Sequence, residues 1–469
     1  MERTSEQTGL NGRVSHWMYA AGETQRPRRA ALADTQSADV CIVGGGLTGL
    51  WTAYYLKRER PDLDVRILEA KFTGYGASGR NGGWVSGLLP GSRERMAQTH
   101  GREAVVRLQH EMDATVDEFM SVIEDNNIEA GAQKGGTLRV ARLPAQAARL
   151  RELKRLDDTW GTEGVEILSS AELRRRANVD GALLGYFNPH CARLDPGRVV
   201  QGLSEVVERL GVTIYEDSEV LRIRPGQAIT GRGSVRSRWV VQATEAYSAH
   251  LPGQRRSVLP ISSSMIVTEP ISDAAWQEIG WNGGETLADA AHMFCYAQRT
   301  EDNRIAIGSE EPAPYRFGSR LDGDGEISPK TVEVLRRTLI RVFPHLSEVR
   351  VAHAWSGNLA VPRDWSASIQ LDADTGLGWA GGYSGHGVAT TNLAARTMRD
   401  LILGKQTSLT RAPWVGHISP NWEPEPIRWL GSRMVHRAFW LADRHEAKGR
   451  ATTSPIARAA SRVARMPFP

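Results

Sequence analysis

Short apolar runs alternate with stretches of helical periodicity at the start of the chain and again between residues 190 and 243. The runs are short, apolar and rich in β-branched side chains, so they predict buried strands over residues 40–43, 65–68, 211–216, 219–223 and 238–243. A helix is predicted after Gly49, and another after Asp195, where Pro196 is typical of a helix start. This alternation predicts an α/β domain with a parallel sheet.

The middle of the chain has a different pattern. Helical spacing covers residues 103–128 and 145–160, with a strand predicted over 135–141 between them. Strands over 293–298 and 304–307 flank Glu301-Asp302-Asn303, which predicts a hairpin. A strand is also predicted over 261–268 and an amphipathic helix over 331–343. Antiparallel strands in this position indicate a second domain inserted into the first.

Three glycines follow the first predicted strand at the spacing of a dinucleotide-binding turn. Gly44 permits the tight turn, Gly46 lets backbone approach a pyrophosphate, and Gly49 lets helix and strand pack closely. The next strand ends in Glu69, which is placed to bind ribose hydroxyls. Strand, glycines, helix, strand and acid in this order predict dinucleotide binding, and a tight turn in an ordinary α/β protein is the alternative.

Two further stretches are dense in glycine. Residues 72–87 combine glycines with Tyr75 and Trp84, which favours backbone lying against a flat ligand over a flexible loop. Residues 377–387 precede a helix predicted over 388–403. The start of that helix is suited to an anion or to the polarised carbonyl of a flavin ring, and a turn that merely needs positive φ is the alternative.

Composition narrows the class of protein. The 469 residues carry a formal net charge of +4, which gives no argument for nucleic acid. Cys41, Cys191 and Cys295 are scattered, which argues against a disulfide framework and suits a reducing cytoplasm. No cysteine–histidine cluster has metal-site spacing, so no metal is expected. Neither a secretory signal nor a membrane-spanning apolar run is predicted.

The two ends of the chain are polar. Residues 1–37 are expected to form an arm that packs His16, Trp17 and Tyr19 on the body, with a disordered leader as the alternative. Residues 409–469 are predicted to be helical over 429–444 and then basic, with a solvated or disordered end. Peripheral membrane or partner contact through Trp429, Phe439 and Trp440 is a second interpretation.

Taken together, these motifs resemble the FAD-dependent D-amino-acid-oxidase-like family, and most of all its γ-glutamylputrescine-oxidase-like and glycine/sarcosine-oxidase branches. The matching segments are residues 43–50, 68–70, 79–83, 211–216, 240–244 and 381–387, and Gly79-Arg-Asn-Gly-Gly83 is the most specific. The resemblance implies an α/β fold in which a Rossmann-type FAD-binding domain carries an inserted substrate domain on a mainly antiparallel sheet.

The predicted boundaries follow from this fold. The FAD-binding domain is expected over 38–90, 190–255 and 350–408, and the substrate domain over 91–189 and 256–349. By resemblance, Glu69 binds the adenosine ribose, Val220 contacts adenine through its backbone, and the turn before residue 388 covers the pyrimidine end of the flavin. The cofactor residues are expected to be Gly44, Gly46, Leu47, Thr48, Gly49, Glu69, Ala70, Ser78, Gly79, Arg80, Asn81, Gly82, Gly83, Val220, Thr244, Gly382, Ser384, Gly385, His386 and Gly387.

Two departures from the family pattern bear on the cofactor. Glu245 stands where many relatives carry glycine, which leaves the geometry of that turn open. No histidine precedes Arg80 and no cysteine lies near Gly382, where some relatives attach the flavin, so non-covalent FAD is expected.

The substrate face is harder to predict. His386 and Tyr296 are the candidate catalytic residues, and Trp84, Trp355 and Arg363 the candidate substrate contacts. Each has an alternative: a helix-start residue for His386, a packed sheet aromatic for Tyr296, a core position for Trp355, and an ion pair with Asp364 or Asp372 for Arg363.

The implied reaction is oxidation of the C–N bond of an amine or amino acid to an imine by hydride transfer to flavin N5, with oxygen as acceptor. This chemistry needs an oriented C–H bond and a deprotonated amine rather than a strong side-chain base. The alternatives are a dehydrogenase that passes electrons to a quinone or carrier protein, a flavin-binding subunit of a larger complex, and a biosynthetic flavoenzyme acting on an N-substituted amino acid or hydrazine.

Overall fold

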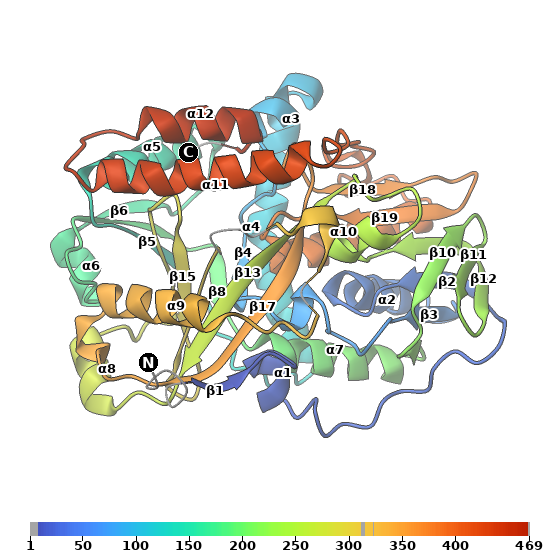
Figure 1. Cartoon of the computed structure of the whole chain (residues 1–469). Helices are drawn as coiled ribbons and strands as arrows, with labels where there is room; N and C mark the ends of the chain where they lie inside the picture. The colour runs from blue at the N-terminus through green and yellow to red at the C-terminus, as the bar shows by residue number, and fades with distance from the viewer. Residues whose placement is uncertain (1–7, 311–314, 322, 468–469) are drawn as a thin grey trace.

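Two β-sheets stand side by side in the computed structural model, which describes residues 8–310, 315–321 and 323–467 (Figure 1). The first has eight strands, and its parallel centre is β19-β12-β2-β3-β9. These five strands are Leu377–Gly381, Ser234–Gln242, Gln36–Val43, Val65–Leu68 and Thr213–Tyr215. Antiparallel strands β10 (Val220–Arg224), β11 (Gln227–Thr230) and β18 (Ser368–Leu371) complete it.

Helices cover the parallel sheet. They are α2 (Leu47–Glu59), α4 (Arg102–Asp125), α7 (Pro196–Arg209) and α10 (Gly387–Ile402), with α3 (Arg93–His100) beside α4. Close packing of α2 depends on Gly49, because a Cβ there would lie 2.1 Å from the carbonyl oxygen of Gly44. The alternation of strand and helix predicted from the sequence is thereby confirmed for this part of the chain.

The second sheet has nine strands in the order β1-β17-β13-β16-β15-β14-β5-β7-β6 and is antiparallel except at β1–β17 and β14–β5. The strands are β1 Thr8–Asn11, β5 Thr137–Ala141, β6 Glu166–Ser169, β7 Leu184–Asn188, β13 Leu259–Thr268, β14 Thr286–Asp289, β15 Cys295–Arg299, β16 Ile305–Glu310 and β17 Val351–Val361. The predicted hairpin is β15–β16, and the expectation of a mainly antiparallel second sheet is confirmed.

One face of the nine-stranded sheet is filled and the other looks toward the first sheet. Leu138, Val140 and Leu287 belong to a buried cluster with α9 (Pro329–Val342) and α8 (Asp273–Ile279). At one end, α5 (Pro144–Trp160) and α6 (Ser170–Arg176) pack against β7 and β6. A two-stranded ladder of β4 (Trp84–Ser86) and β8 (Cys191–Arg193) lies in the region between the sheets.

The described segment before β2 contains β1 and a short helix. Helix α1 (His16–Ala20) buries Trp17, which is 2% exposed and donates its indole N–H to the carbonyl oxygen of Asn81 at 2.9 Å. Tyr19 is half exposed, and its ring and that of His16 meet the His353 ring of β17 edge-on, at 5.9 and 6.2 Å between centroids. Trp17 therefore braces the glycine-rich loop that begins after β3.

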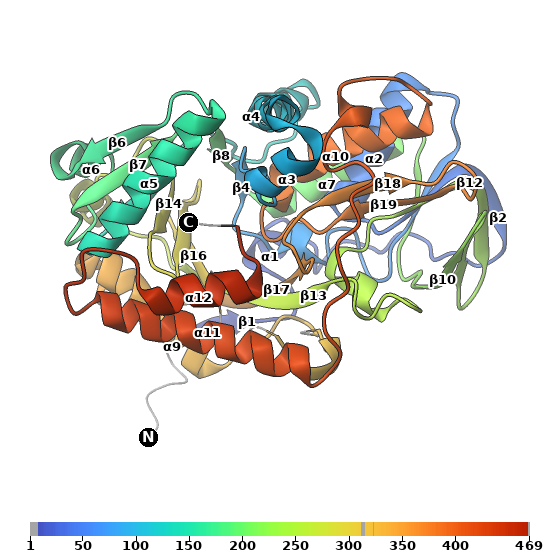
Figure 2. The same ribbon diagram turned by 90° about the horizontal axis from the view of Figure 1, so that it is seen from above.

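The C-terminal segment is folded, so the prediction of a solvated or disordered end is wrong for residues 455–464. Helices α11 (Ile427–Glu446) and α12 (Pro455–Ala464) form a hairpin that lies across the outside of the molecule (Figures 1 and 2). Small residues Ala457 and Ala460 pack against Phe439 and Ala442. Alanines at helical spacing carry a weak hydrophobic signal, which explains why the basic residues dominated the prediction.

Candidate functional site

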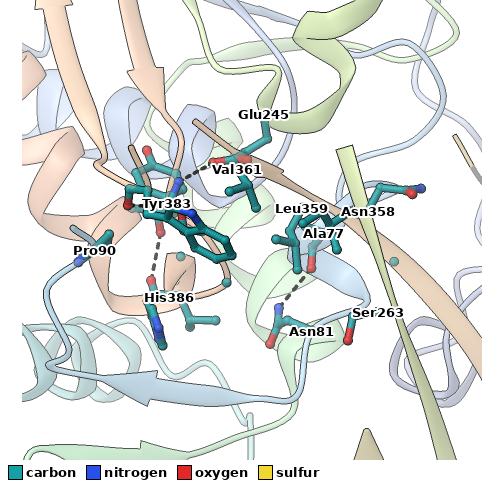
Figure 3. Close-up of a pocket in the computed structure, with 18 of the residues that line it drawn as sticks. Ala77, Asn81, Pro90, Glu245, Ser263, Asn358, Leu359, Val361, Tyr383 and His386 are labelled. Atoms are coloured by element: carbon teal, nitrogen blue, oxygen red, sulfur yellow. Dashed lines mark hydrogen bonds between the residues drawn. The ribbon is translucent and has the colours of Figure 1, made fainter. Parts of the chain in front are cut away.

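A cavity of about 990 Å³ lies between the two sheets, at the carboxyl ends of β2, β3 and β12 (Figure 3). Glu69 and Val220 line it at one end, and Tyr296 and His386 line it further along. The carboxyl edge of a parallel sheet is where ligands bind in folds of this type. The cavity therefore occupies the position that the sequence predicts for a dinucleotide.

The first glycine turn leads from β2 into α2. Gly44 has a φ of +117°, and a Cβ there would lie 2.4 Å from the carbonyl oxygen of Ala243. Helix α2 begins after Gly46 without a side-chain cap, and the Leu47 N–H donates to Ser78 Oγ at 2.8 Å. Backbone N–H groups and the positive end of the helix dipole thus face the cavity, as an anion site requires.

Glu69 lies at the end of β3, beside this turn. Its carboxylate accepts hydrogen bonds from the Gly45 N–H at 2.8 Å and the Lys71 N–H at 2.9 Å. Burial raises the pKa of Glu69, while these backbone donors oppose the shift. Both bonds fix the side chain at the cavity wall.

The second glycine turn leads from β19 into α10 and is tied to the first. Helix α10 also begins without a side-chain cap, after His386. The Tyr383 hydroxyl lies 3.1 Å from Thr48 Oγ1 at the start of α2. Two helix N-termini, far apart in the sequence, therefore open on one cavity and are joined by a buried hydrogen bond.

Glu245 makes a second link to this turn. Its carboxylate accepts from the N–H groups of Gly382 at 2.9 Å, Tyr383 at 3.2 Å and Ala360 at 3.0 Å (Figure 3). Its φ of +42° keeps the left-handed conformation that glycine adopts easily, so the departure from the family pattern leaves the turn intact. Burial raises the pKa of Glu245 to about 7, against the pull of the three N–H donors.

The glycine-rich loop after β3 is held by Arg80 and Asn81. Arg80 donates from Nε to the Tyr75 carbonyl at 2.8 Å and from Nη1 to the Ser356 carbonyl at 3.0 Å. Its Nη2 is buried and has no hydrogen-bond partner among the described residues. Asn81 donates to the Ser78 carbonyl at 2.7 Å and accepts from the Gly83 N–H at 2.7 Å. The loop is rigid, and it leaves one guanidinium nitrogen unpaired.

Most of the predicted cofactor residues line the cavity. Those that do are Gly44, Gly46, Leu47, Thr48, Glu69, Ala70, Ser78, Arg80, Asn81, Gly82, Val220, Thr244, Ser384, Gly385, His386 and Gly387. Gly49, Gly79, Gly83 and Gly382 do not. They are packing positions: a Cβ at Gly79 would meet the Gly74 carbonyl at 2.4 Å, and one at Gly83 would meet the Leu194 carbonyl at 2.2 Å.

A cross-strand row of the nine-stranded sheet forms the other side of the cavity. Paired residues across β16, β15, β14 and β5 are Gly308, Tyr296, Ala288 and Arg139. Directly paired residues point to the same face, so this row presents an aromatic ring, a small residue and a guanidinium in sequence. Tyr296, Ala288 and Arg139 all line the cavity.

Tyr296 is fixed between two glycines. Its ring lies 2.4 Å from the position of a Cβ on Gly308 and 2.9 Å from one on Gly82. Its hydroxyl lies 2.8 Å from Ser263 Oγ, and Trp84 meets the ring edge-on at 6.2 Å between centroids. The ring therefore connects the glycine-rich loop to the sheet and leaves the space above Ala288 open.

His386 carries a neutral imidazole at physiological pH. Burial, together with the smaller effect of the positive charge of Arg139, lowers its pKa to about 4. A neutral ring offers one hydrogen-bond donor and one acceptor. His386 is thus suited to contact a neutral polar group rather than to act as a strong base.

Two predicted substrate contacts do not line the cavity. Trp355 is completely buried between Trp17 and Met265, and its indole N–H donates to the Arg80 carbonyl at 3.0 Å. Arg363 pairs with Glu423 at 3.0 Å and donates to the Val463 and Ala464 carbonyls. Trp355 is therefore a core residue, and Arg363 anchors the C-terminal segment instead of a ligand.

Three cavity residues were missed by the sequence analysis. Arg139 lies on a correctly predicted strand, where the alternation of Leu138, Arg139 and Val140 places it opposite the filled face. Tyr383 carries the link between the turns, and Glu245 was noticed only as a departure. The contacts of Tyr383 and Glu245 are to residues distant in the chain, so no local pattern indicates them.

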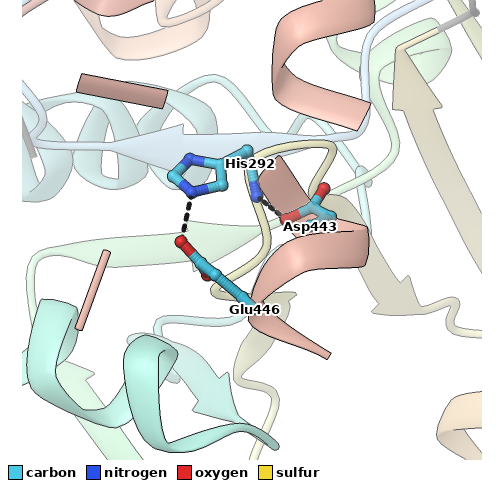
Figure 4. Close-up of side chains that lie close together, drawn as sticks. All are labelled: His292, Asp443 and Glu446. Carbon is cyan, nitrogen blue, oxygen red and sulfur yellow. Dashed lines mark hydrogen bonds and ion pairs between the residues drawn. The ribbon is translucent and has the colours of Figure 1, made fainter. Parts of the chain in front are cut away.

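His292, Asp443 and Glu446 bring potential metal ligands within 4.8 Å of one another (Figure 4). However, Asp443 accepts the backbone N–H groups of His292 and Met293, both at 2.9 Å. Glu446 binds the Arg149 guanidinium at 2.8 Å, so a cation already occupies the position that a metal would take. The cluster fastens α11 to the loop before β15.

The cavity fits FAD by the chemistry of its donors. Two uncapped helix N-termini suit negatively charged groups, Glu69 suits a ribose, and the unpaired Arg80 Nη2 suits an oxygen-rich ligand. The cavity is lined both by Val220 of β10, in the first sheet, and by Tyr296 of β15, in the nine-stranded sheet.

No helix in the described ranges is long and apolar enough to cross a membrane.

Comparison with known proteins agrees with this geometry. Residues 39–401 match the model of the DAO family, described as FAD dependent oxidoreductase. The chain is 30% identical to gamma-glutamylputrescine oxidoreductase of Escherichia coli over 397 residues, covering 82% of this chain and 88% of that protein. It is 29% identical to a probable oxidoreductase of Haemophilus influenzae, over 81% of this chain and 86% of the relative.

Solved structures share the fold at lower identity. Glycine oxidase from Geobacillus kaustophilus matches with a TM-score of 0.66 at 21% identity, over 82% of this chain and 100% of that one. L-Proline dehydrogenase from P. horikoshii matches with a TM-score of 0.65 at 18% identity, over 81% and 98%. With the family model covering most of its length, the chain belongs to the DAO family of FAD-dependent oxidoreductases.

Proposed function

We propose that the protein oxidises the C–N bond of an amine or amino acid to an imine, with non-covalently bound FAD and oxygen as the final electron acceptor. The observation that carries this proposal is the pair of glycine turns, joined through Thr48–Tyr383, that open on one cavity beneath Tyr296. When bound, FAD supplies the acceptor for a hydride from the carbon next to nitrogen. Among the described residues, no cysteine lines the cavity, which supports non-covalent binding.

The side chains supply orientation and charge. The neutral His386 can accept a hydrogen bond from the substrate nitrogen and brings no negative charge that would stabilise an ammonium group, which favours the neutral amine. A neutral amine is the form that can release a hydride from its α-carbon. Tyr296 and Trp84 limit the space above the glycine-rich loop and thereby orient the substrate.

The test is anaerobic mixing of the FAD-loaded protein with a panel of primary, secondary and acylated amines and amino acids. Bleaching of the flavin absorbance, followed by hydrogen peroxide release on admission of air, is the expected result. Yellow protein that no member of the panel bleaches would contradict the proposed reaction while leaving the family assignment intact.

A second candidate differs in the electron acceptor. Helix α11 exposes Ile427, Leu430, Met434, Trp440 and Leu441. Exposed cations on the same helix are Arg433, Arg437 and Arg444. Such a surface is typical of contact with an anionic membrane or an acidic partner, which favours transfer to a quinone or carrier protein. Phe439, named earlier for this contact, is buried and cannot take part. Rapid reoxidation by a soluble quinone with no peroxide would select this candidate.

A further inference from the structure

We propose that the substrate carries an anionic group, which Arg139 binds, and an apolar group, which lies in an outer chamber closed by the α11–α12 hairpin. This inference rests on the proposed oxidation of an amine or amino acid and names the class of its substrate. It follows from the charges of the cavity, from the side chains beyond Ala288, and from the way the hairpin is fastened.

Four arginines line the cavity, and the three other than Arg139 have partners within the protein. Arg80 donates to two backbone carbonyls, Arg93 pairs with Asp157 at 2.8 Å, and Arg149 pairs with Glu446 at 2.8 Å. No hydrogen bond or ion pair joins the Arg139 guanidinium to any residue that the structure describes. A half-buried cation without a partner is costly to desolvate, and an anionic ligand removes that cost.

The acidic side chains near this end of the cavity are bonded to other residues, and none of those that the structure describes forms an ion pair with Arg139. Asp157 accepts from Arg93 and from the Tyr186 hydroxyl at 2.7 Å. Glu94 accepts from Ser92 Oγ at 2.9 Å and the Trp160 indole at 3.1 Å. Asp289 accepts from the Cys295 N–H at 3.0 Å. Arg139 therefore remains available to a carboxylate of the substrate.

The part of the cavity beyond Arg139 presents a group of apolar side chains beside Arg149, Asp157 and His292, which are paired with other residues. Its lining comes from α5, the loop before β15 and the C-terminal hairpin: Leu150, Leu153, Leu156, Phe294, Phe439 and Met466. Leu153 and Leu156 are only partly buried by the protein, so an apolar ligand group would gain by covering them. This outer chamber, defined by these six residues, suits an aromatic or alkyl group.

The hairpin is held firmly enough to serve as a wall. Glu446 is completely buried and binds Arg149 of α5 and His292 of the loop before β15, both at 2.8 Å. Phe439 stacks on the His292 ring at 5.7 Å between centroids. The hairpin lies outside residues 39–401 that match the family model. The part of the outer chamber that the hairpin supplies, Phe439 and Met466, thus lies outside the family match, whereas Leu150, Leu153, Leu156 and Phe294 lie within it.

The test uses the FAD-loaded full chain and three unreactive probes: 4-phenylbutanoate has both groups, 4-phenylbutanamide lacks the charge, and acetate lacks the apolar group. Binding is measured by calorimetry and by perturbation of the flavin spectrum. We expect 4-phenylbutanoate to bind at least about tenfold more tightly than either other probe, since each lost contact corresponds to about one power of ten.

Two variants separate the two contacts. Arg139→Met should weaken 4-phenylbutanoate about 30-fold and leave the amide within about threefold, and Arg139→Lys should recover part of the loss. Leu156→Ser should weaken both phenyl probes about tenfold and leave acetate unchanged. The matched controls are Arg155→Met, on the exposed side of α5, and Leu441→Ser, which is 41% exposed on α11. Neither control should change any of the three affinities.

Equal weakening of acid and amide by Arg139→Met would overturn the anion contact, and unchanged affinities in Leu156→Ser would overturn the outer chamber. Absence of binding by all three probes would overturn both. FAD content and anaerobic bleaching by amines are recorded on the same samples. A protein that binds the probes but is bleached by no amine would refute the proposed reaction and not this inference.

Discussion

The inner and outer parts of the cavity are built from different material. Around Gly44–Thr48 and Gly382–Gly387 the wall is mainly backbone, and its N–H groups are fixed by donating hydrogen bonds to Ser78, Glu69 and Glu245. Around Arg139 and Leu156 the wall is made of side chains from several separate elements. Backbone groups keep their positions when side chains are substituted, so a wall made of backbone can bind the same ligand in sequences that have diverged. A wall made of side chains changes with each substitution. The difference separates cofactor binding from substrate choice.

The largest effect should come from disrupting the packing behind the inner wall. Gly49→Val places a side chain against the Gly44 carbonyl oxygen, which a Cβ would approach to 2.1 Å, and against the Ile42 side chain at 3.1 Å, so the backbone would have to move. We expect a loss of more than about 3 kcal/mol in the free energy of unfolding and no bound FAD, measured by denaturation and by absorbance near the flavin maximum. Gly431→Ala, in α11 with no atom within 4 Å of the new Cβ, is the control and should retain FAD.

Next in size is removal of the lock on the outer wall. Glu446→Gln leaves Arg149 buried beside a neutral amide, which should cost about 3 kcal/mol in the free energy of unfolding. Hydrogen bonds and the charges of Arg149 and His292 hold the pKa of Glu446 at about 2 despite its burial. The stability that it contributes is present above its unfolded value of about 4.5 and is lost as pH falls toward 2. FAD content should remain, because this wall does not touch the cofactor turns.

Chemical denaturation between pH 2 and 7 measures this difference. The exposed Glu103→Gln, with Glu103 93% exposed in its pair with Arg107, is the control. If Glu446→Gln lost FAD as completely as Gly49→Val, the two walls would not be separable.

A smaller effect, of opposite dependence on pH, is expected at Glu245. Because its pKa in the folded protein is raised to about 7, the folded state binds a proton more tightly than the unfolded chain. Its contribution to stability is full below about 4.5 and declines as pH rises through 7. In protein without FAD, Glu245→Gln should remove this dependence, which spans at most about 3 kcal/mol for a pKa raised from 4.5 to about 7, measured by unfolding across pH 4–8. An unchanged pH profile would contradict the assignment.

The smallest effect should come from the link between the turns. Tyr383→Phe removes the hydrogen bond to Thr48 Oγ1 and should cost about 1 kcal/mol of stability, with weaker FAD binding. Titration of the unloaded protein with FAD measures the change. An Arg155→Met control on α5 should bind FAD as the original protein does. Unaltered affinity in Tyr383→Phe would show that the two turns close on the cofactor without this bond.

The same contrast decides what the sequence could predict. Gly44, Gly46 and Glu69 are fixed by local geometry, so their spacing was enough to place them on the cavity, and the same spacing placed Gly49 at the close contact between α2 and the turn. Gly79 and Gly83 share the motif but serve packing, a distinction that depends on Gly74 and Leu194 across the fold. Local pattern therefore located the inner wall and could not assign every glycine in it.

The outer wall was predicted poorly because its contacts are distant in the chain. Arg363 meets Glu423, 60 residues away, and no spacing rule indicates that pair. Trp355 was predicted to contact the substrate, but Trp17, more than 300 residues earlier in the chain, packs against its ring and helps to bury it. Arg139 sat on a predicted strand, but a lone charge on a strand is more often solvated than functional.

The hairpin beyond the family match has a practical consequence. It reaches the cavity through a few inward side chains, while the cluster of Arg149, His292 and Glu446 together with Arg363 and Arg428 attaches it to the body. Libraries confined to those inward positions could alter which substrates are accepted while the redox centre stays as it is. Selectivity could then be varied without loosening the attachments that hold the hairpin in place.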